Sequence, residues 1–154
     1  MILPNYNSGS IVNLVSSILS SYGLKNIYNP LENFNLPNHK NVVFIVIDGL
    51  GLDFLQNHGK NSFFLQKTIT SVTSVFPSTT AAALTSLMTG VAPLQHALTG
   101  WFMYFRELAV AGVPIQFAPR FTDKSFTDFD IDINDIFNYE PIFNRITCGN
   151  PSAA

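Results

Sequence analysis

Six consecutive apolar residues, Val42 to Ile47, constrain the fold of this chain more than any other stretch of its sequence. Most of them are β-branched, and an uninterrupted run of this kind predicts a strand that is buried on both faces of a parallel sheet. Asp48 and Gly49 follow the run directly. In open α/β sheets, ligands bind at the carboxyl ends of the strands, so Asp48 is expected where chemistry usually takes place.

The neighbouring segments predict further elements of an α/β fold. Residues 11–22 carry apolar side chains at three- and four-residue spacings, which predicts an amphipathic helix that Ser10 caps and Gly23 ends. Residues 68–76 have strong β propensity and predict a second strand. Beyond them, the sequence predicts a helix at residues 80–89, a short helix at 103–110, a strand at 114–118 and a half-exposed extended segment at 128–135.

Three hydroxyl residues, Ser78, Thr79 and Thr80, stand at the start of the helix expected at residues 80–89, and Gly90 is expected to cap its other end. Serine and threonine are preferred N-cap residues, because their side-chain oxygens accept hydrogen bonds from amides of the first turn. A nucleophile aimed by the same helix is the alternative interpretation. Local sequence alone does not decide between these two roles.

Asp48 and His96 each have a functional and a structural interpretation. Asp48 is either a metal ligand or a turn residue that accepts hydrogen bonds from the following amides. His96 is either a ligand or base, or a buried histidine with satisfied hydrogen bonds. Since His96 is isolated from other candidate ligands in the sequence, we interpret it as structural.

Charge and composition exclude several classes of function. Eight basic and ten acidic residues give a net charge of -2, so no basic field is available and nucleic-acid binding is not expected. Cys148 is the only cysteine and cannot form an internal disulfide. The first 23 residues lack a basic start, and polar residues interrupt their apolar stretch. We therefore expect neither a signal peptide nor a membrane span, and a cytoplasmic location.

The order of these motifs resembles the type I phosphodiesterase and nucleotide pyrophosphatase branch of the alkaline phosphatase superfamily. The resemblance covers roughly residues 41–112: a buried strand ending in Asp48, the "FPSTT" turn opening a helix, then "MTG", Pro93 and His96. It implies an alkaline phosphatase-like α/β fold, in which helices flank a mostly parallel sheet. It also implies two divalent metal ions, usually zinc, beside a threonine or serine nucleophile at a helix start.

The resemblance assigns roles to individual residues. Asp48 matches the metal-binding aspartate after the first strand, and Thr80 matches the nucleophile, which also coordinates metal as an alkoxide. Ser78 or Thr79 is then left to cap the helix. His96 matches a histidine that is not a metal ligand. Trp101 stands where the pyrophosphatases have an asparagine that contacts phosphate, so nucleotide diesterase activity is not implied.

We therefore expect a metal-dependent phosphoric-ester hydrolase that acts on a small-molecule phosphate ester. The family's other metal ligands follow the matched region, and this chain has no histidine after His96. Residues 1–154 are accordingly expected to form the N-terminal part of a single, truncated catalytic domain that is inactive alone. The alternative is a truncated or degenerate relative without catalysis, serving a structural or interaction role.

Overall fold

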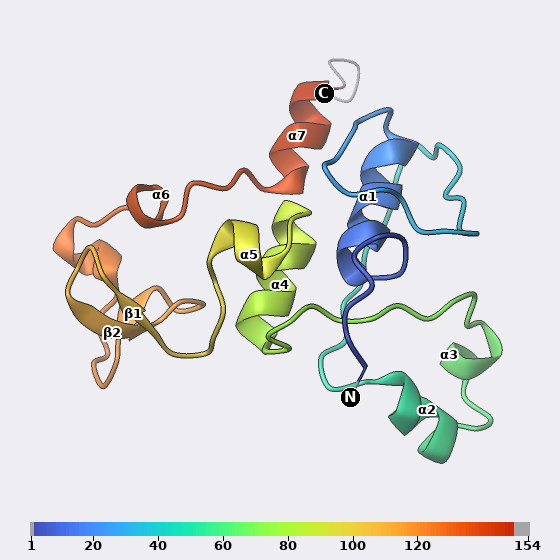
Figure 1. Ribbon diagram of the computed structural model, residues 1–154, viewed down its shortest axis with the longest axis horizontal. Coiled ribbons are helices and arrows are strands. Elements are labelled where there is room, and N and C mark those ends of the chain that lie inside the picture. The colour runs from blue at the N-terminus through green and yellow to red at the C-terminus, as the bar shows by residue number, and fades with distance from the viewer. Residues whose placement is uncertain (1, 150–154) are drawn as a thin grey trace.

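The computed structural model describes residues 2–149. In Figure 1, α5 and α7 lie beside α4, which packs on α1, while a small sheet lies to one side of this group and α2 and α3 lie apart from it. Among these residues, none of the helices combines the length and hydropathy that a membrane crossing requires. The helices are α1 (Ile11–Ser21), α2 (Leu52–His58), α3 (Phe63–Gln66), α4 (Thr80–Thr89), α5 (Pro93–His96), the 3-10 helix η1 (Phe126–Phe129), α6 (Ile133–Ile136) and α7 (Ile142–Gly149). The strands are β1 (Met103–Phe105), β2 (Val110–Val113) and β3 (Ala118–Pro119).

The helical core lies between α1, α4 and α7. Apolar side chains on one face of α1 pack against α4, and Ile142 of α7 closes one end of this core. Burying such side chains is the main source of stability for helices of this length. Two clusters of buried residues make up the core, Val12, Val75, Ala82 and Ala92 in one and Val15, Leu19, Leu87 and Ile142 in the other.

The amphipathic helix predicted at residues 11–22 is confirmed as α1. Ser10 precedes the helix as expected, and both its backbone N–H and its hydroxyl donate to Asn13 Oδ1, at 2.9 and 2.6 Å. Gly23 follows the helix with φ of +74°, a conformation that favours glycine. The local signals at both ends of this helix were therefore sufficient to place it.

Asn26 connects α1, α4 and α7. Its Nδ2 donates to Ser16 Oγ at 2.9 Å and to the carbonyl oxygen of Gly90 at 2.7 Å. Arg145 of α7 donates from Nη1 to Asn26 Oδ1 at 3.3 Å. One amide side chain therefore holds the carboxyl end of α4 against two other helices.

The sheet is three-stranded and antiparallel, in the order β1-β2-β3, with Phe105 opposite Val110 and Val113 opposite Ala118. The expectation of a mostly parallel sheet is not met in the described residues, although the chain combines helices and strands in an α/β arrangement. The predicted helix at 103–110 and the predicted strand at 114–118 are wrong. The turns that form instead place Ala109 and Phe117 at positive φ, 52° and 46°, which is uncommon for residues other than glycine.

Aromatic side chains cover the inner face of this sheet. Phe105 packs edge-on against Phe126 and Phe137, with ring centroids 5.2 and 5.8 Å apart, and Phe117 contacts Phe126 in the same way. The extended segment predicted at 128–135 is also wrong, because η1 and α6 occupy most of it. Asp132 starts α6 by accepting a hydrogen bond from the N–H of Asn134 at 2.8 Å.

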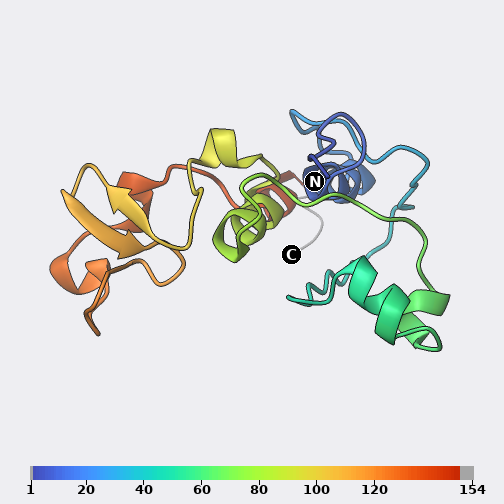
Figure 2. The ribbon, with the colours of Figure 1, turned by 60° about the horizontal axis from the view of Figure 1, so that its bottom comes forward.

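The apolar run Val42–Ile47 is not a buried strand in this structure, which corrects the main expectation from the sequence. It crosses from α1 to α2 without regular secondary structure (Figures 1 and 2), and the side chains of Val43 and Ile45 are 82% and 74% exposed. Residues 68–76 form only a single parallel bridge, between Thr73 and Ser10. A strand needs neighbours to pair its backbone, and no described segment pairs with residues 42–47.

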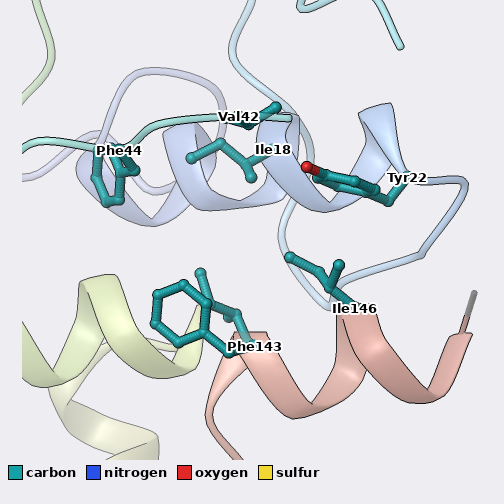
Figure 3. A pocket seen from close by; sticks show the side chains of 7 residues that line it. Ile18, Tyr22, Val42, Phe44, Phe143 and Ile146 are labelled. Atoms are coloured by element: carbon teal, nitrogen blue, oxygen red, sulfur yellow. The ribbon is translucent and has the colours of Figure 1, made fainter. Parts of the chain in front are cut away.

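One end of the run covers a small apolar cleft between α1 and α7 (Figure 3). Val42 and Phe44 lie along α1 with Ile18 and Tyr22, and Phe143 and Ile146 of α7 lie on the opposite side of the cleft. Its volume of about 170 Å³ is below the range of roughly 300–1,000 Å³ that is usual for small-molecule sites. We interpret the cleft as loose packing between elements.

Candidate functional site

The N-terminus of α4 positions the hydroxyl of Thr80. Thr79 is the N-cap residue, and its side-chain oxygen accepts a hydrogen bond from the N–H of Ala82 at 3.3 Å. Thr80 is the first helical residue, and its side chain is half-buried. The prediction that Ser78 or Thr79 caps this helix is confirmed, with Thr79 in the role, and the hydroxyl of Thr80 is left for other partners.

Asp48 lies beside Thr80 although 32 positions separate them in the sequence. The hydroxyl of Thr80 donates to Asp48 Oδ2 in a long hydrogen bond of 3.5 Å. The other carboxylate oxygen, Oδ1, accepts from the N–H of Gly49 at 3.0 Å, and Gly49 turns the chain with φ of +74°. Asp48 Oδ1 therefore stabilises the turn at Gly49, while Oδ2 faces the start of α4.

These two side chains offer oxygen donors to a cation. Oxygens 3.5 Å apart can both contact one divalent ion, because zinc–oxygen bonds are roughly 2.0–2.2 Å long. The positive end of α4 adds a field that favours anions next to Thr80. Within residues 2–149, no group of three or more His, Cys, Asp or Glu side chains is arranged to hold a metal ion. The pair thus fits one side of a metal site.

Comparison with known proteins assigns the chain to a family. A sequence model of the type I phosphodiesterase / nucleotide pyrophosphatase family matches residues 42–145, more than half of the chain. The chain belongs to this family. The resemblance predicted from the motifs is thereby confirmed, and the match contains both Asp48 and Thr80. No curated protein and no solved structure matched the chain.

Membership of the type I phosphodiesterase / nucleotide pyrophosphatase family indicates a hydrolase of phosphoric esters. His96, which lies in the matched region, is only 1% exposed. Its Nδ1 accepts from the N–H of Leu98 at 3.1 Å, so Nε2 carries the proton and donates to Ser86 Oγ at 3.0 Å. Burial lowers the pKa of His96 from 6.5 to about 4, which keeps the ring neutral. These contacts are those of a structural histidine.

Trp101, where the pyrophosphatases of this family have asparagine, lies in the segment between α5 and β1 and is 44% exposed. Of the aromatic residues near it in the sequence, Phe105 is buried in the sheet core. Phe102 lies outside, where its ring stacks on the guanidinium of Arg120 at 4.4 Å from the ring centroid. Phe121, which follows Arg120 in the chain, stacks on the same guanidinium at 4.4 Å. The aromatic residues that follow Trp101 in the sequence are thus divided between core and surface.

Proposed function

We propose that this chain carries the nucleophile and one metal ligand of a metal-dependent phosphoric-ester hydrolase. The supporting observation is the 3.5 Å approach of Thr80 Oγ1 to Asp48 Oδ2 at the start of α4. Capping by Thr79 leaves the Thr80 hydroxyl unbound to the helix, and the amides of the first turn face any anion that approaches it. Thr80 is therefore the hydroxyl best placed to meet a phosphoryl group.

The proposed reaction proceeds in two displacements. Thr80 Oγ1 gives its proton to solvent and attacks phosphorus, and the bond from phosphorus to the ester oxygen of the leaving alcohol breaks as that oxygen takes up a proton from solvent. Water then attacks the phosphothreonine, the bond from phosphorus to Oγ1 breaks, and Thr80 regains a proton as the phosphate leaves. The amides at the start of α4 stabilise the negative charge on the phosphoryl oxygens in both steps.

The proposed cofactor is a pair of divalent ions, with zinc expected from the family. Asp48 Oδ2 and Thr80 Oγ1 would hold one ion, and the remaining ligands would come from a longer polypeptide. When bound, such ions polarise the phosphoryl oxygens and favour ionisation of hydroxyl groups at neutral pH. Because Asp48 keeps Oδ1 on the amide of Gly49, its Oδ2 is already aimed at the site.

We also propose that residues 1–154 are the N-terminal part of one catalytic domain. The exposed run Val42–Ile47 supports this proposal, because contiguous apolar surface of this kind marks a face that another segment covers. In an alkaline phosphatase-like fold, neighbouring strands would pair with the backbone of this run, and helices would cover both faces of the sheet that they form. A cytoplasmic location remains a prediction.

The experiment compares two adjacent threonines in the polypeptide that the complete gene encodes, loaded with zinc. Thr80→Ala should abolish hydrolysis of p-nitrophenyl phosphate and formation of the phosphoryl-enzyme, detected by intact-protein mass spectrometry. Thr79→Ala is the matched control and should retain both. Asp48→Asn should lower the bound-zinc stoichiometry. A Thr80→Ala protein that still becomes phosphorylated contradicts the assignment, and a wild-type protein that binds no zinc and hydrolyses no ester favours the non-catalytic alternative.

A further inference from the structure

An open groove of about 740 Å³ lies next to the candidate site. Its lining comes from the segment before α1, from the residues before α4 that are hydrogen-bonded to that segment, and from the start of α2. Its volume is within the range of small-molecule sites. The residues that line it are Ile2, Leu3, Pro4, Asn5 and Gly9, then Gly51, Leu52 and Asp53, and finally Ser71 to Phe76 with Ser78.

The lining of the groove ends a few residues from Thr80 and Asp48, which do not themselves line it. Ser78 at its rim lies two positions before Thr80, and Gly51 lies three positions after Asp48. Thr80 Oγ1 and Asp48 Oδ2, which are 3.5 Å apart, thus follow closely in the chain from two of the segments that line the groove. A molecule with its phosphorus at Thr80 would extend its organic group into this groove.

Non-local hydrogen bonds hold the segment before α1 in place. The N–H of Asn5 donates to Thr73 Oγ1 at 2.9 Å, and Thr73 donates its own N–H to the carbonyl of Gly9 at 2.8 Å. The hydroxyl of Tyr6 accepts from the N–H of Phe76 at 3.1 Å. The segment before α1 is thus fixed in the fold by several hydrogen bonds to the segment that leads into α4.

The side chains that line the groove indicate which kind of organic group of a phosphate ester would bind there. Seven of these side chains are apolar and six are polar, and Ile2 and Leu3 are 86% and 70% exposed, so these two offer apolar surface that a ligand can cover. Among the described residues that line the groove, Asp53 is the only one with a charged side chain, and none is a lysine or an arginine. A polyanionic leaving group such as a nucleoside diphosphate would meet a carboxylate there and no cation.

From this lining we propose that the groove binds the uncharged, apolar organic group of the substrate, an alkyl or aryl group esterified to the phosphate at Thr80. The inference rests on the proposed function, because it places the phosphorus at Thr80. It assigns to the N-terminal segment a role in substrate selection. Asp53 contributes by disfavouring esters whose organic group carries further negative charge.

A homologous series of ligands tests the proposal. Ethyl, butyl and hexyl phosphate are titrated into the zinc-loaded full-length protein, and binding is followed by the methyl NMR resonances of Leu3 and Val72. Each buried methylene should tighten the dissociation constant about fourfold, the equivalent of roughly 0.8 kcal/mol. The methyl groups of Ile18, which line the small cleft of Figure 3, should not shift. AMP, with the same phosphate on a polar group, should bind more weakly than hexyl phosphate.

Two variants with matched charge locate the effect. Leu3→Asp introduces a carboxylate at an exposed position of the groove and should remove most of the chain-length dependence. Phe129→Asp introduces the same charge at an exposed position of η1 and should leave the dependence unchanged. Affinity independent of chain length, shifts at Ile18 in place of Leu3, or an unchanged dependence in Leu3→Asp would each overturn the proposal.

Different results would overturn the groove assignment and the assignment of Thr80 as the nucleophile. A phosphoryl-enzyme on Thr80 together with affinity independent of chain length overturns only the groove assignment. Chain-length-dependent binding in a protein whose Thr80→Ala variant is still phosphorylated supports the groove as an apolar binding site and overturns Thr80 as the nucleophile.

Discussion

Protonation of His96 should destabilise the fold as the pH falls below neutrality. The ring is 1% exposed, Nδ1 accepts from the amide of Leu98, and Nε2 donates to Ser86, so a second ring proton would replace the hydrogen bond from Leu98 and place a charge in a buried site. A cation would have to displace the Leu98 amide and lose its hydration. The contact joins the middle of α4 to the end of α5, which lies directly before the segment leading to β1.

The size of the effect follows from the pKa of His96. In the unfolded chain its pKa is near 6.5, and burial lowers it to about 4 in the folded chain. Between these values the unfolded state binds a proton that the folded state does not, so the free energy of unfolding falls as the pH falls. At 1.36 kcal/mol per pH unit, the total loss by pH 4 is about 3 kcal/mol. Above pH 6.5, where His96 is neutral in both states, its burial no longer makes the free energy of unfolding depend on pH.

Urea unfolding followed by circular dichroism, from pH 8 to pH 4, measures this loss. His96→Gln is the control, because glutamine keeps hydrogen-bonding capacity but does not titrate in this range. The variant should be less stable at pH 8, and the difference between the two proteins should shrink as the pH falls from 6.5 to 4. Subtraction removes the titration of carboxylates common to both. A stability difference that is independent of pH in this window would refute the argument.

Three other substitutions test the fold at single positions. Thr79→Ala should lower the free energy of unfolding by about 1 kcal/mol through loss of the cap on the N–H of Ala82, as measured by urea unfolding, and a loss near zero would contradict the capping role. Gly90→Ala should cost about 1–2 kcal/mol for a side chain at φ of +74°, and more because the added Cβ would lie 3.1 Å from a neighbouring nitrogen. Gly23→Ala is the control, because Gly23 has the same φ but open space around it. Equal losses of stability in the two variants would show that the close contact at Gly90 contributes nothing. Ile45→Lys in the 154-residue chain should change stability by less than about 0.5 kcal/mol and reduce light scattering, whereas a loss of several kcal/mol would show that Ile45 is buried.

The sequence predicted the two main helices well because their ends are determined locally. Ser10 and Gly23 lie at the ends of α1, and Thr79 and Gly90 lie at those of α4, so each end is marked by a residue next to it in the sequence. Such signals depend on a few neighbouring residues, so periodicity and capping rules are enough to find them.

The strands could not be predicted in this way. A run such as Val42–Ile47 has β propensity, but a strand forms only where another segment supplies backbone partners. The turns around β2 depend on Ala109 and Phe117 at positive φ, which their side chains do not signal. The hairpin is stabilised instead by aromatic contacts between residues far apart in the chain, such as Phe105 and Phe137.

The candidate site was predicted only in part. The resemblance to the family brought Asp48 and Thr80 together, and the structure places their side chains within 3.5 Å. The proposed groove could not be predicted from the sequence, because the hydrogen bonds between Thr73 and both Asn5 and Gly9 span more than sixty positions. No spacing rule relates two segments that meet only in the folded chain.

The hydrogen bonds of Thr73 have a practical consequence for anyone who engineers this protein. They hold the first residues at the edge of the groove, so an affinity tag fused ahead of Ile2 would stand at its mouth. Such a tag would compete with ligands, and its removal would itself alter an assay. The turn between β1 and β2 is a better position for a label, because Glu107 is exposed there and the hairpin lies away from the N-terminus in both views (Figures 1 and 2).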